Sequence, residues 1–192
     1  MRIGIFGGSF DPIHLGHLIL VEQCRDQAKL DQVFLIPAPR PPHKVNKAEA
    51  TFDHRLEMLK LAIAGHPELQ VDTCEMDRPG LSYTVDTLRH LHQREPKNEW
   101  FLILGGDSVR DFETWRDPEG ISKLATLLIV DRSGTEGIAP PSYSRYQRIA
   151  SPLIDISSTD IRERVKTGRS IRYLVPDAVA AFIDANKLYR NS

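Results

Sequence analysis

Near the start of the chain, the first candidate for chemistry is a glycine- and histidine-containing segment, Gly7-Gly8-Ser9-Phe10-Asp11-Pro12-Ile13-His14-Leu15-Gly16-His17. Paired glycines after a strand-like run allow a ligand to approach the backbone, and the helix expected next offers unpaired N–H groups with partial positive charge. His14 and His17 are three residues apart, so their imidazoles face the same way on one helical turn, and Gly16 keeps that face open. These features predict a phosphate site.

Two other interpretations of this segment stay open. Either histidine alone is more typical of a residue that caps or packs a first helix, whereas the pair joined to a glycine-rich turn favours phosphate binding. A metal site is the third interpretation and the weakest, because no nearby Asp, Glu or Cys has an obvious ligand spacing. We therefore expect no metal ion bound directly by protein side chains here.

A second candidate lies toward the other end of the chain, at residues 155–164. Ser157, Ser158 and Thr159 place consecutive hydroxyls where a helix should begin, and capping that helix is their simplest role. Arg162 follows within one turn, and its guanidinium suits bidentate contact with a phosphate. Together the two segments predict a polyphosphate held between two helix N-termini.

Strand-like runs and helical patterns alternate along the chain. The elements that they predict must position the two candidate segments, 7–17 and 155–164. The strands are expected at 2–6, 32–36, 69–73, 100–104 and 127–130, and the helices at 15–29, 51–64, 84–94 and 107–112. This order is typical of βαβ units. Near-continuous apolar strands indicate a sheet covered on both faces. We predict an α/β fold, a Rossmann-like, doubly wound and mainly parallel sheet with helices on both faces.

The remaining segments complete one expected domain, 1–192. Residues 132–151 contain glycines and prolines without periodicity and predict a long surface loop, in which Arg145 and Arg148 are surface charges. After it we expect a short strand at 153–156, a helix opened by Ser158 or Thr159, and a last helix from Pro176-Asp177 to about Asn186. Residues 1–150 would form the Rossmann-like core and 151–192 a small helical part.

One helix has a clear apolar face. Between 51 and 64, apolar residues recur at three- and four-residue steps, and charged residues fall largely elsewhere. The face predicted to pack on the sheet contains Phe52, Leu56, Leu59 and Ile63, and the residues expected away from it are Asp53, Arg55, Glu57 and Lys60.

Composition excludes several classes of protein. The 192 residues include 25 Lys+Arg and 26 Asp+Glu, for a net charge of -1, and 41% are hydrophobic. The balanced charge argues against strong nucleic-acid binding. No apolar run approaches the ~20 residues that span a bilayer, and no signal peptide is evident, so we expect a cytoplasmic protein without membrane contact. Cys24 and Cys74 suit small core residues better than a disulfide framework or a zinc site.

The two phosphate motifs resemble the (H/T)xGH and ISSTxxR motifs of the nucleotidylyltransferase superfamily, and within it the bacterial nicotinate mononucleotide adenylyltransferases. The resemblance runs over essentially the whole chain and departs mainly at 132–151. It rests on GGSFDPIHLGH at 7–17, PAPRPPHK at 37–44, RLEM at 55–58, SYTVDTL at 82–88, GGDS at 105–108, Trp115, ISSTDIR at 156–162 and the tail from 174 to 189.

The resemblance implies an ATP site and four catalytic residues. His14 and His17 would stabilise charge on the α-phosphate, while Arg162 would hold the β and γ groups with the hydroxyls of the second segment. Lys44 would add a cation over the same charge. The implied ATP-binding residues are Gly7, Gly8, Ser9, Phe10, His14, His17, Gly105, Asp107, Ser157, Ser158, Thr159 and Arg162, with Asp107 on the adenosine ribose.

The resemblance also implies an acceptor site for nicotinate mononucleotide. Thr84, mainly through its backbone, would receive the nicotinate carboxylate, and Trp115 would stack on the pyridine ring. The implied acceptor-binding residues are Gly8, Ser9, Lys44, Tyr83, Thr84 and Trp115. Each role has an alternative: Trp115 as a core residue, Asp107 as a helix N-cap, and Lys44 as one member of a solvated basic stretch.

The implied reaction is adenylyl transfer from ATP to nicotinate mononucleotide, giving nicotinate adenine dinucleotide and pyrophosphate in NAD biosynthesis. Because the attacking phosphate is already an anion, catalysis needs positioning and charge stabilisation, and Mg²⁺ is expected with ATP. A homo-oligomer is compatible with the sequence. Alternatives are an acceptor such as phosphopantetheine, or a non-catalytic nucleotide-binding regulator.

Overall fold

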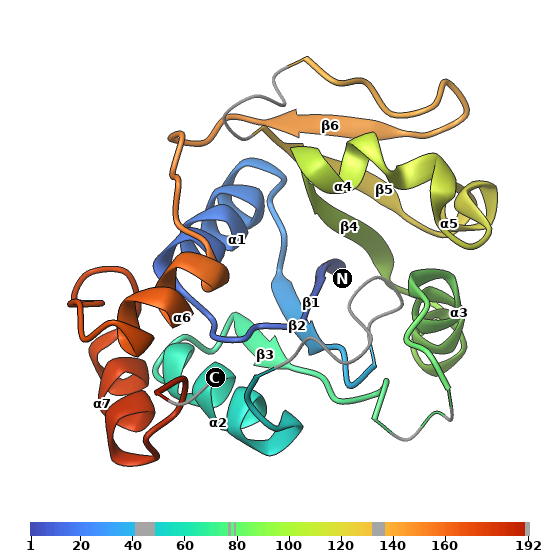
Figure 1. Ribbon diagram of the computed structural model, residues 1–192. Helices are drawn as coiled ribbons and strands as arrows, with labels where there is room; N and C mark the ends of the chain where they lie inside the picture. The colour runs from blue at the N-terminus through green and yellow to red at the C-terminus, as the bar shows by residue number, and fades with distance from the viewer. Residues whose placement is uncertain (41–48, 77, 79, 132–136, 191–192) are drawn as a thin grey trace.

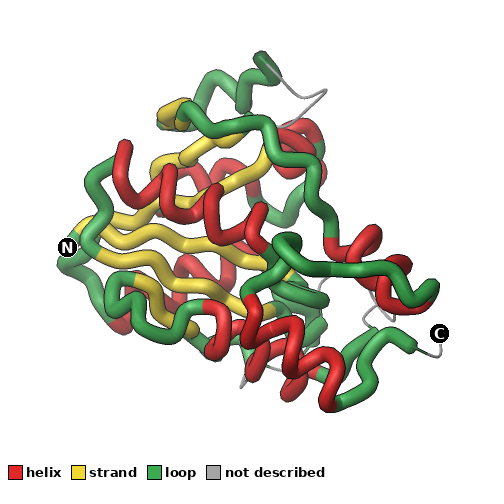
Figure 2. Tube along the Cα trace, turned by 90° about the vertical axis from the view of Figure 1, so that its left-hand side faces the viewer, coloured by secondary structure: helices red, strands yellow, loops and turns green. Residues whose placement is uncertain are grey.

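A parallel sheet organises the molecule. The computed structural model describes residues 1–40, 49–76, 78, 80–131 and 137–190. In these residues six strands pair side by side, all parallel, in the order β3-β2-β1-β4-β5-β6 (Figures 1 and 2). Their bounds are β1 Arg2–Gly8, β2 Gln32–Pro37, β3 Leu69–Val71, β4 Glu99–Gly105, β5 Thr126–Val130 and β6 Tyr146–Ile149. The order reverses between β1 and β4, where sheets of this kind bind ligands beyond the carboxyl ends of their strands.

Helices cover both faces of the sheet, which confirms the predicted fold class. One face packs against α1 (Leu15–Gln27), α2 (Phe52–Ala62), α6 (Ser158–Lys166) and α7 (Asp177–Ala185). The other packs against α3 (Thr84–Arg94), α4 (Gly106–Arg110) and α5 (Pro118–Leu124), with a 3-10 turn, η2, at Phe112–Thr114. These two groups of helices lie on opposite sides in Figure 1.

Alternating side chains of the strands explain why both faces are apolar. In β4, Phe101 and Ile103 join the core beneath α1, whereas Trp100, Leu102 and Leu104 join the core beneath α3. Successive residues of a strand point to opposite faces, so a strand buried on both sides has an uninterrupted apolar sequence.

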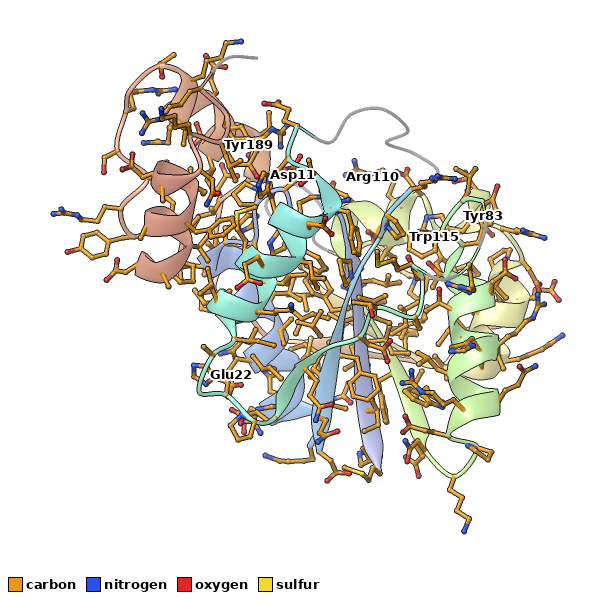
Figure 3. All side chains as sticks on the ribbon, turned by 90° about the horizontal axis from the view of Figure 1, so that it is seen from below. Asp11, Glu22, Tyr83, Arg110, Trp115 and Tyr189 are labelled. Atoms are coloured by element: carbon orange, nitrogen blue, oxygen red, sulfur yellow. The ribbon has the colours of Figure 1, made fainter. Side chains whose placement is uncertain are left out.

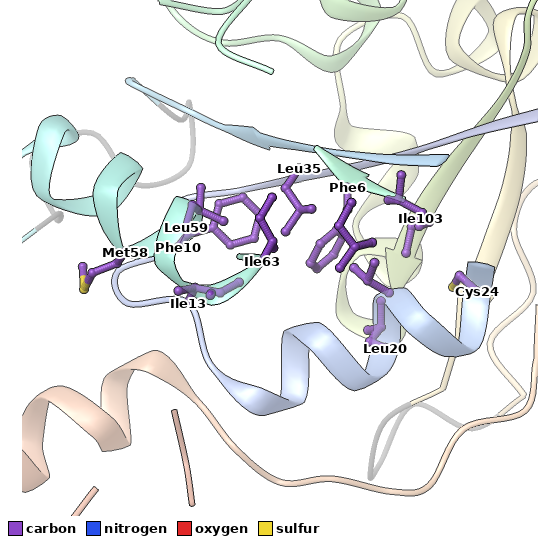
Figure 4. Packing of buried hydrophobic residues seen from close by; sticks show 14 of the residues in the cluster. Phe6, Phe10, Ile13, Leu20, Cys24, Leu35, Met58, Leu59, Ile63 and Ile103 are labelled. Atoms are coloured by element: carbon purple, nitrogen blue, oxygen red, sulfur yellow. The ribbon is translucent and has the colours of Figure 1, made fainter. Parts of the chain in front are cut away.

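Phe10 anchors the turn that follows β1 in the core beneath α1. Its backbone has a φ of 48°, and its buried ring meets Phe6 edge to face, with centroids 5.6 Å apart (Figure 4). A Cβ at Gly8 would lie 3.0 Å from the Phe10 ring, closer than most Cβ contacts, so a larger residue here would push the ring away. The aromatic ring therefore fixes the path of the backbone between β1 and α1.

Two predictions for the later part of the chain are wrong. The expected surface loop at 132–151 contains β6, and the expected strand at 153–156 is irregular. Three of the four β6 residues are exposed, so this edge strand is held by main-chain pairing to β5 and has no apolar pattern to reveal it. Residues 153–156 lie past the end of that pairing, and Leu153 is 59% exposed. Helix α5 was not predicted either.

The other predicted elements are present with shifts of a few residues at their ends. The last helix ends at Ala185, and Pro176 is its N-cap. Cys24 is fully buried and Cys74 half-buried, and both are free thiols. Among the described residues, no helix has the length and hydropathy needed to cross a membrane.

Candidate active site

His14 and His17 form a rigid stacked pair at the start of α1. Their ring centroids are 3.6 Å apart with 19° between the planes. His14 is the N-cap of α1, is 2% exposed, and its Nδ1 accepts the His17 backbone N–H at 3.3 Å. An Nδ1 that accepts leaves the proton of the neutral imidazole on Nε2, which then acts as a donor.

Aromatic packing sets the orientation of His17. Its ring centroid lies 5.7 Å from that of Phe6 and 5.4 Å from that of Phe10. Because both neighbours belong to the buried core, the imidazole has little rotational freedom. The pair thus has the rigidity that a preorganised charge-stabilising site requires.

The second predicted segment lies against the first. Ser157 caps α6 by accepting the Asp160 N–H at 3.1 Å, so the capping interpretation is correct for this residue. Ser158 Oγ donates to the Pro12 carbonyl at 2.9 Å, which fastens the N-terminus of α6 to the turn before α1. Thr159 is exposed in the first turn of α6.

Arg162 joins the two segments through its guanidinium. Its Nη1 donates to the Asp11 carbonyl at 3.0 Å, and its Nε donates to Glu49 Oε1 at 2.8 Å. The N-termini of α1 and α6 and this guanidinium therefore meet at one place, although they are about 150 residues apart in sequence.

Asp11 holds the same turn from the other side. Its buried carboxylate accepts the Glu49 N–H at 2.8 Å, the Ala50 N–H at 3.2 Å and the Tyr189 hydroxyl at 2.8 Å. Burial and the charge of Asp11 raise the pKa of Tyr189, so the phenol remains a proton donor. Figure 3 shows Asp11 and Tyr189 together at the end of the sheet opposite Glu22.

A pocket opens near the N-terminus of α1, between the carboxyl ends of β1 and β4 and the N-terminus of α3. Its volume is about 270 Å³. Gly8 and Ser9 line one side, and Tyr83, Thr84 and Trp115 line another, on the same end of the sheet as Asp11 (Figure 3). The segment 7–17 thus lines the pocket with its first residues and carries the histidine pair at the N-terminus of α1.

Comparisons with known proteins identify the family of this chain. Residues 5–164 match the family model described as cytidylyltransferase-like. A protein of Thermus thermophilus named probable nicotinate-nucleotide adenylyltransferase is 48% identical over 192 residues, covering 99% of this chain and 100% of its own. A protein of the same name from Salinibacter ruber is 44% identical, covering 99% and 98%. This chain belongs to the nicotinate-nucleotide adenylyltransferase family.

A solved structure shares the fold of this adenylyltransferase family member. Nicotinic acid mononucleotide adenylyltransferase of Plasmodium falciparum, complexed with NaAD, superposes with a TM-score of 0.82 at 19% identity, covering 100% of this chain and 98% of that one. At this identity the likeness concerns the backbone architecture.

Two predicted site residues of the adenylyltransferase sit at the end of β4. Gly105 is the N-cap of α4 and lines the pocket. Asp107 lies in the first turn of α4, so the interpretation of Asp107 as the N-cap is wrong. Its side chain is exposed, and its Oδ1 lies 3.8 Å from Arg110 Nη1. A carboxylate at the carboxyl end of a central strand stands where α/β sheets bind ligands.

Other predicted residues have mixed outcomes. Lys44 lies outside the described residues, so its predicted role stays a prediction. Trp115 packs 5.6 Å from Phe112 and also lines the pocket, so it has both a core contact and a face toward the site. Arg145 and Arg148 are exposed, as predicted, and Arg148 pairs with Asp131 at 2.7 Å.

Arg55 supports the backbone of the pocket, a role that the sequence pattern does not predict. It was expected away from the packed face of α2, yet it is 2% exposed and its Nη1 donates to the carbonyls of Ser9 at 2.5 Å and Ala38 at 3.0 Å. Burial lowers its pKa, an effect that the charge of Asp11 opposes. The signal was its spacing, since Arg55, Met58, Leu59 and Ala62 share one buried stripe.

The sequence pattern also assigns no role to Asp11, Glu75 or Tyr189, since Asp11 and Tyr189 pair across 178 positions and Glu75 is a single glutamate in a turn. Among the described residues, no group of three His, Cys, Asp or Glu side chains is placed to hold a metal ion.

Proposed function

We propose that this enzyme transfers the adenylyl group of ATP to nicotinate mononucleotide, forming nicotinate adenine dinucleotide and releasing pyrophosphate. The observation that carries the proposal is the shared segment 7–17, which lines an aromatic-walled pocket with Gly8 and Ser9 and presents the stacked histidine pair a few residues later. One substrate in the pocket and one at the helix N-termini would therefore meet over this segment.

The chemistry needs positioning more than acid–base groups. The nucleophile is the phosphate of the mononucleotide, an anion that requires no general base, and it attacks the α-phosphorus while pyrophosphate leaves. His14 and His17 would donate to the α-phosphoryl oxygens. Arg162 with the first turn of α6 would hold the departing β and γ groups. Preorganised donors of this kind contribute because they need no reorientation as charge develops.

Mg²⁺ would enter with ATP as part of the substrate. In nucleotide sites this ion is held largely by phosphate oxygens and water, with few protein ligands. Divalent metal chemistry therefore needs no cluster of carboxylates on the chain. In this proposal the cations of the protein share the phosphate charge with Mg²⁺, and Lys44 would add to them.

The acceptor would lie with its pyridine ring against Trp115. An indole face suits a planar heterocycle, and Tyr83 adds a second aromatic side chain to the lining of the same pocket. The N-terminus of α3 begins at Thr84, so its backbone N–H groups offer partial positive charge to the nicotinate carboxylate. Both features favour a charged aromatic acceptor over a flexible aliphatic one.

The test is a pyrophosphate-release assay with ATP and Mg²⁺, run in parallel with nicotinate mononucleotide, nicotinamide mononucleotide and phosphopantetheine. Release with nicotinate mononucleotide far above the other two supports the proposal. Equal or faster release with phosphopantetheine, or no release with folded protein that still binds ATP, overturns it.

A further inference from the structure

A buried carboxyl group lines the acceptor pocket. Glu75, in the turn that follows β3, is 8% exposed and is the one acidic residue in the described lining of the pocket. Ser82 and Thr84 line the same wall. A carboxylate in this position would repel a substrate that carries a carboxylate of its own, and the low dielectric of a buried wall would strengthen that repulsion.

Glu75 is tied to a cation through Thr87. The Thr87 hydroxyl donates to Glu75 Oε1 at 2.5 Å and accepts from Arg78 Nη2 at 2.5 Å. Arg78 Nη2 lies 3.7 Å from Glu75 Oε1, so the three groups form a closed triangle. Thr87 and Glu75 line the pocket, whereas Arg78 does not. Arg78 can therefore affect a ligand in the pocket only through Glu75 and Thr87 or through its electric field.

The triangle also holds the start of α3. Thr87 Oγ1 lies 3.3 Å from the Tyr83 carbonyl, and the Thr87 backbone N–H bonds the same carbonyl at 3.2 Å. A neutral donor and acceptor would serve this mechanical purpose, without the desolvation cost of a buried ion pair. The presence of charged groups at Glu75 and Arg78 therefore needs an electrostatic explanation.

We propose that Arg78 is a specificity-determining residue, which neutralises Glu75 across Thr87 and so allows the pocket to accept a mononucleotide whose ring carries a carboxylate. This inference rests on the proposed function. Burial is the main influence on Glu75 and raises the pKa of its carboxyl group above the usual value, while hydrogen bonds from Thr87 and Ser82 and the charge of Arg78 oppose that rise. Without Arg78 the wall would favour the neutral carboxamide of nicotinamide mononucleotide.

The experiment compares kcat/KM for nicotinate and nicotinamide mononucleotides in the wild type, Arg78→Gln, Glu75→Gln and the double variant. Arg78→Gln is expected to lower the nicotinate-to-nicotinamide ratio about tenfold, the size of effect of one uncompensated charge at a partly screened site. Glu75→Gln should keep or raise the ratio. The double variant should recover the wild-type ratio, because it removes both charges.

Arg89→Gln is the matched control. Arg89 lies in α3, pairs with Asp86 and Asp117 at the surface, and does not line the pocket. Its loss should therefore leave the nicotinate-to-nicotinamide ratio unchanged. Thermal unfolding of each variant identifies any loss of fold, and Glu75→Gln alone still tests the inference if Arg78→Gln does not fold.

Three outcomes overturn the inference: equal losses with both mononucleotides in Arg78→Gln, no recovery in the double variant, or a lower ratio in Glu75→Gln. A wild-type enzyme that uses neither mononucleotide would instead overturn the proposed function, so the two failures are distinguishable.

Discussion

The Tyr189 hydroxyl donates a 2.8 Å hydrogen bond to Asp11 Oδ1, and so joins the last part of the chain to the turn before α1 across 178 positions of sequence. Asp11 in turn orders the backbone at Glu49 and Ala50. With the contacts that Ser158 and Arg162 of α6 make to Pro12 and Asp11, the turn that precedes the histidine pair is stabilised from three separate segments.

Tyr189→Phe should destabilise the protein by about 1–2 kcal/mol, because it removes the donor to a buried carboxylate that keeps its other partners. Urea unfolding measures the change. Tyr173→Phe is the control, because Tyr173 is 78% exposed. Equal stability of the two variants would show that the buried hydrogen bond contributes nothing.

His17→Ala should lower kcat at least about 100-fold with a much smaller change in the KM for ATP, the pattern of a contact that strengthens in the transition state. Steady-state pyrophosphate release measures both constants. His66→Ala, at an exposed position, should retain wild-type kinetics. An unchanged kcat in His17→Ala would remove this residue from the mechanism.

Trp115→Ala should raise the KM for the mononucleotide about tenfold or more while the KM for ATP changes little, since stacking contributes roughly 1–3 kcal/mol per base. The ring also packs on Phe112, so unfolding must be measured alongside. A loss of stability with unchanged KM would leave Trp115 with a core role alone.

Glu49→Gln should lower the KM for ATP by about two- to fivefold. Glu49 Oε1 accepts from Arg162 Nε at 2.8 Å, so the carboxylate competes with phosphate for the same guanidinium. An isothermal titration with ATP gives a second reading of the same effect. A higher KM would instead show that Glu49 positions Arg162 for the substrate.

What the sequence predicts depends on how far apart the interacting residues lie. Strands such as β4 are uninterrupted apolar runs, and the turn at 7–17 contains its glycines and histidines within a few residues. A short stretch of sequence is therefore enough to predict each of them. Edge strand β6 is held by backbone pairing and shows no such pattern. Arg55 is missed because its carbonyl partner at Ser9 lies 46 positions away, and nothing local marks that carbonyl.

The candidate site follows the same rule. The sequence predicts that 7–17 and 157–162 both face a polyphosphate, and the structure brings these two segments into contact through Ser158 and Pro12. It does not predict that Glu75 lines the acceptor pocket, because a single glutamate in a turn has no pattern of its own.

The two halves of the proposed site lie in different parts of the sequence, so they are synthesised at different times. Among the described residues, all those that line the pocket proposed for the acceptor come from the first 121 positions, whereas the turn at Asp11 is held by Ser158, Arg162 and Tyr189. A growing chain therefore contains the whole acceptor pocket while the turn at Asp11 still lacks its partners from the C-terminal segment. Under the proposed function, the half of the site that would hold the ATP phosphates is therefore completed only after α6 has been synthesised.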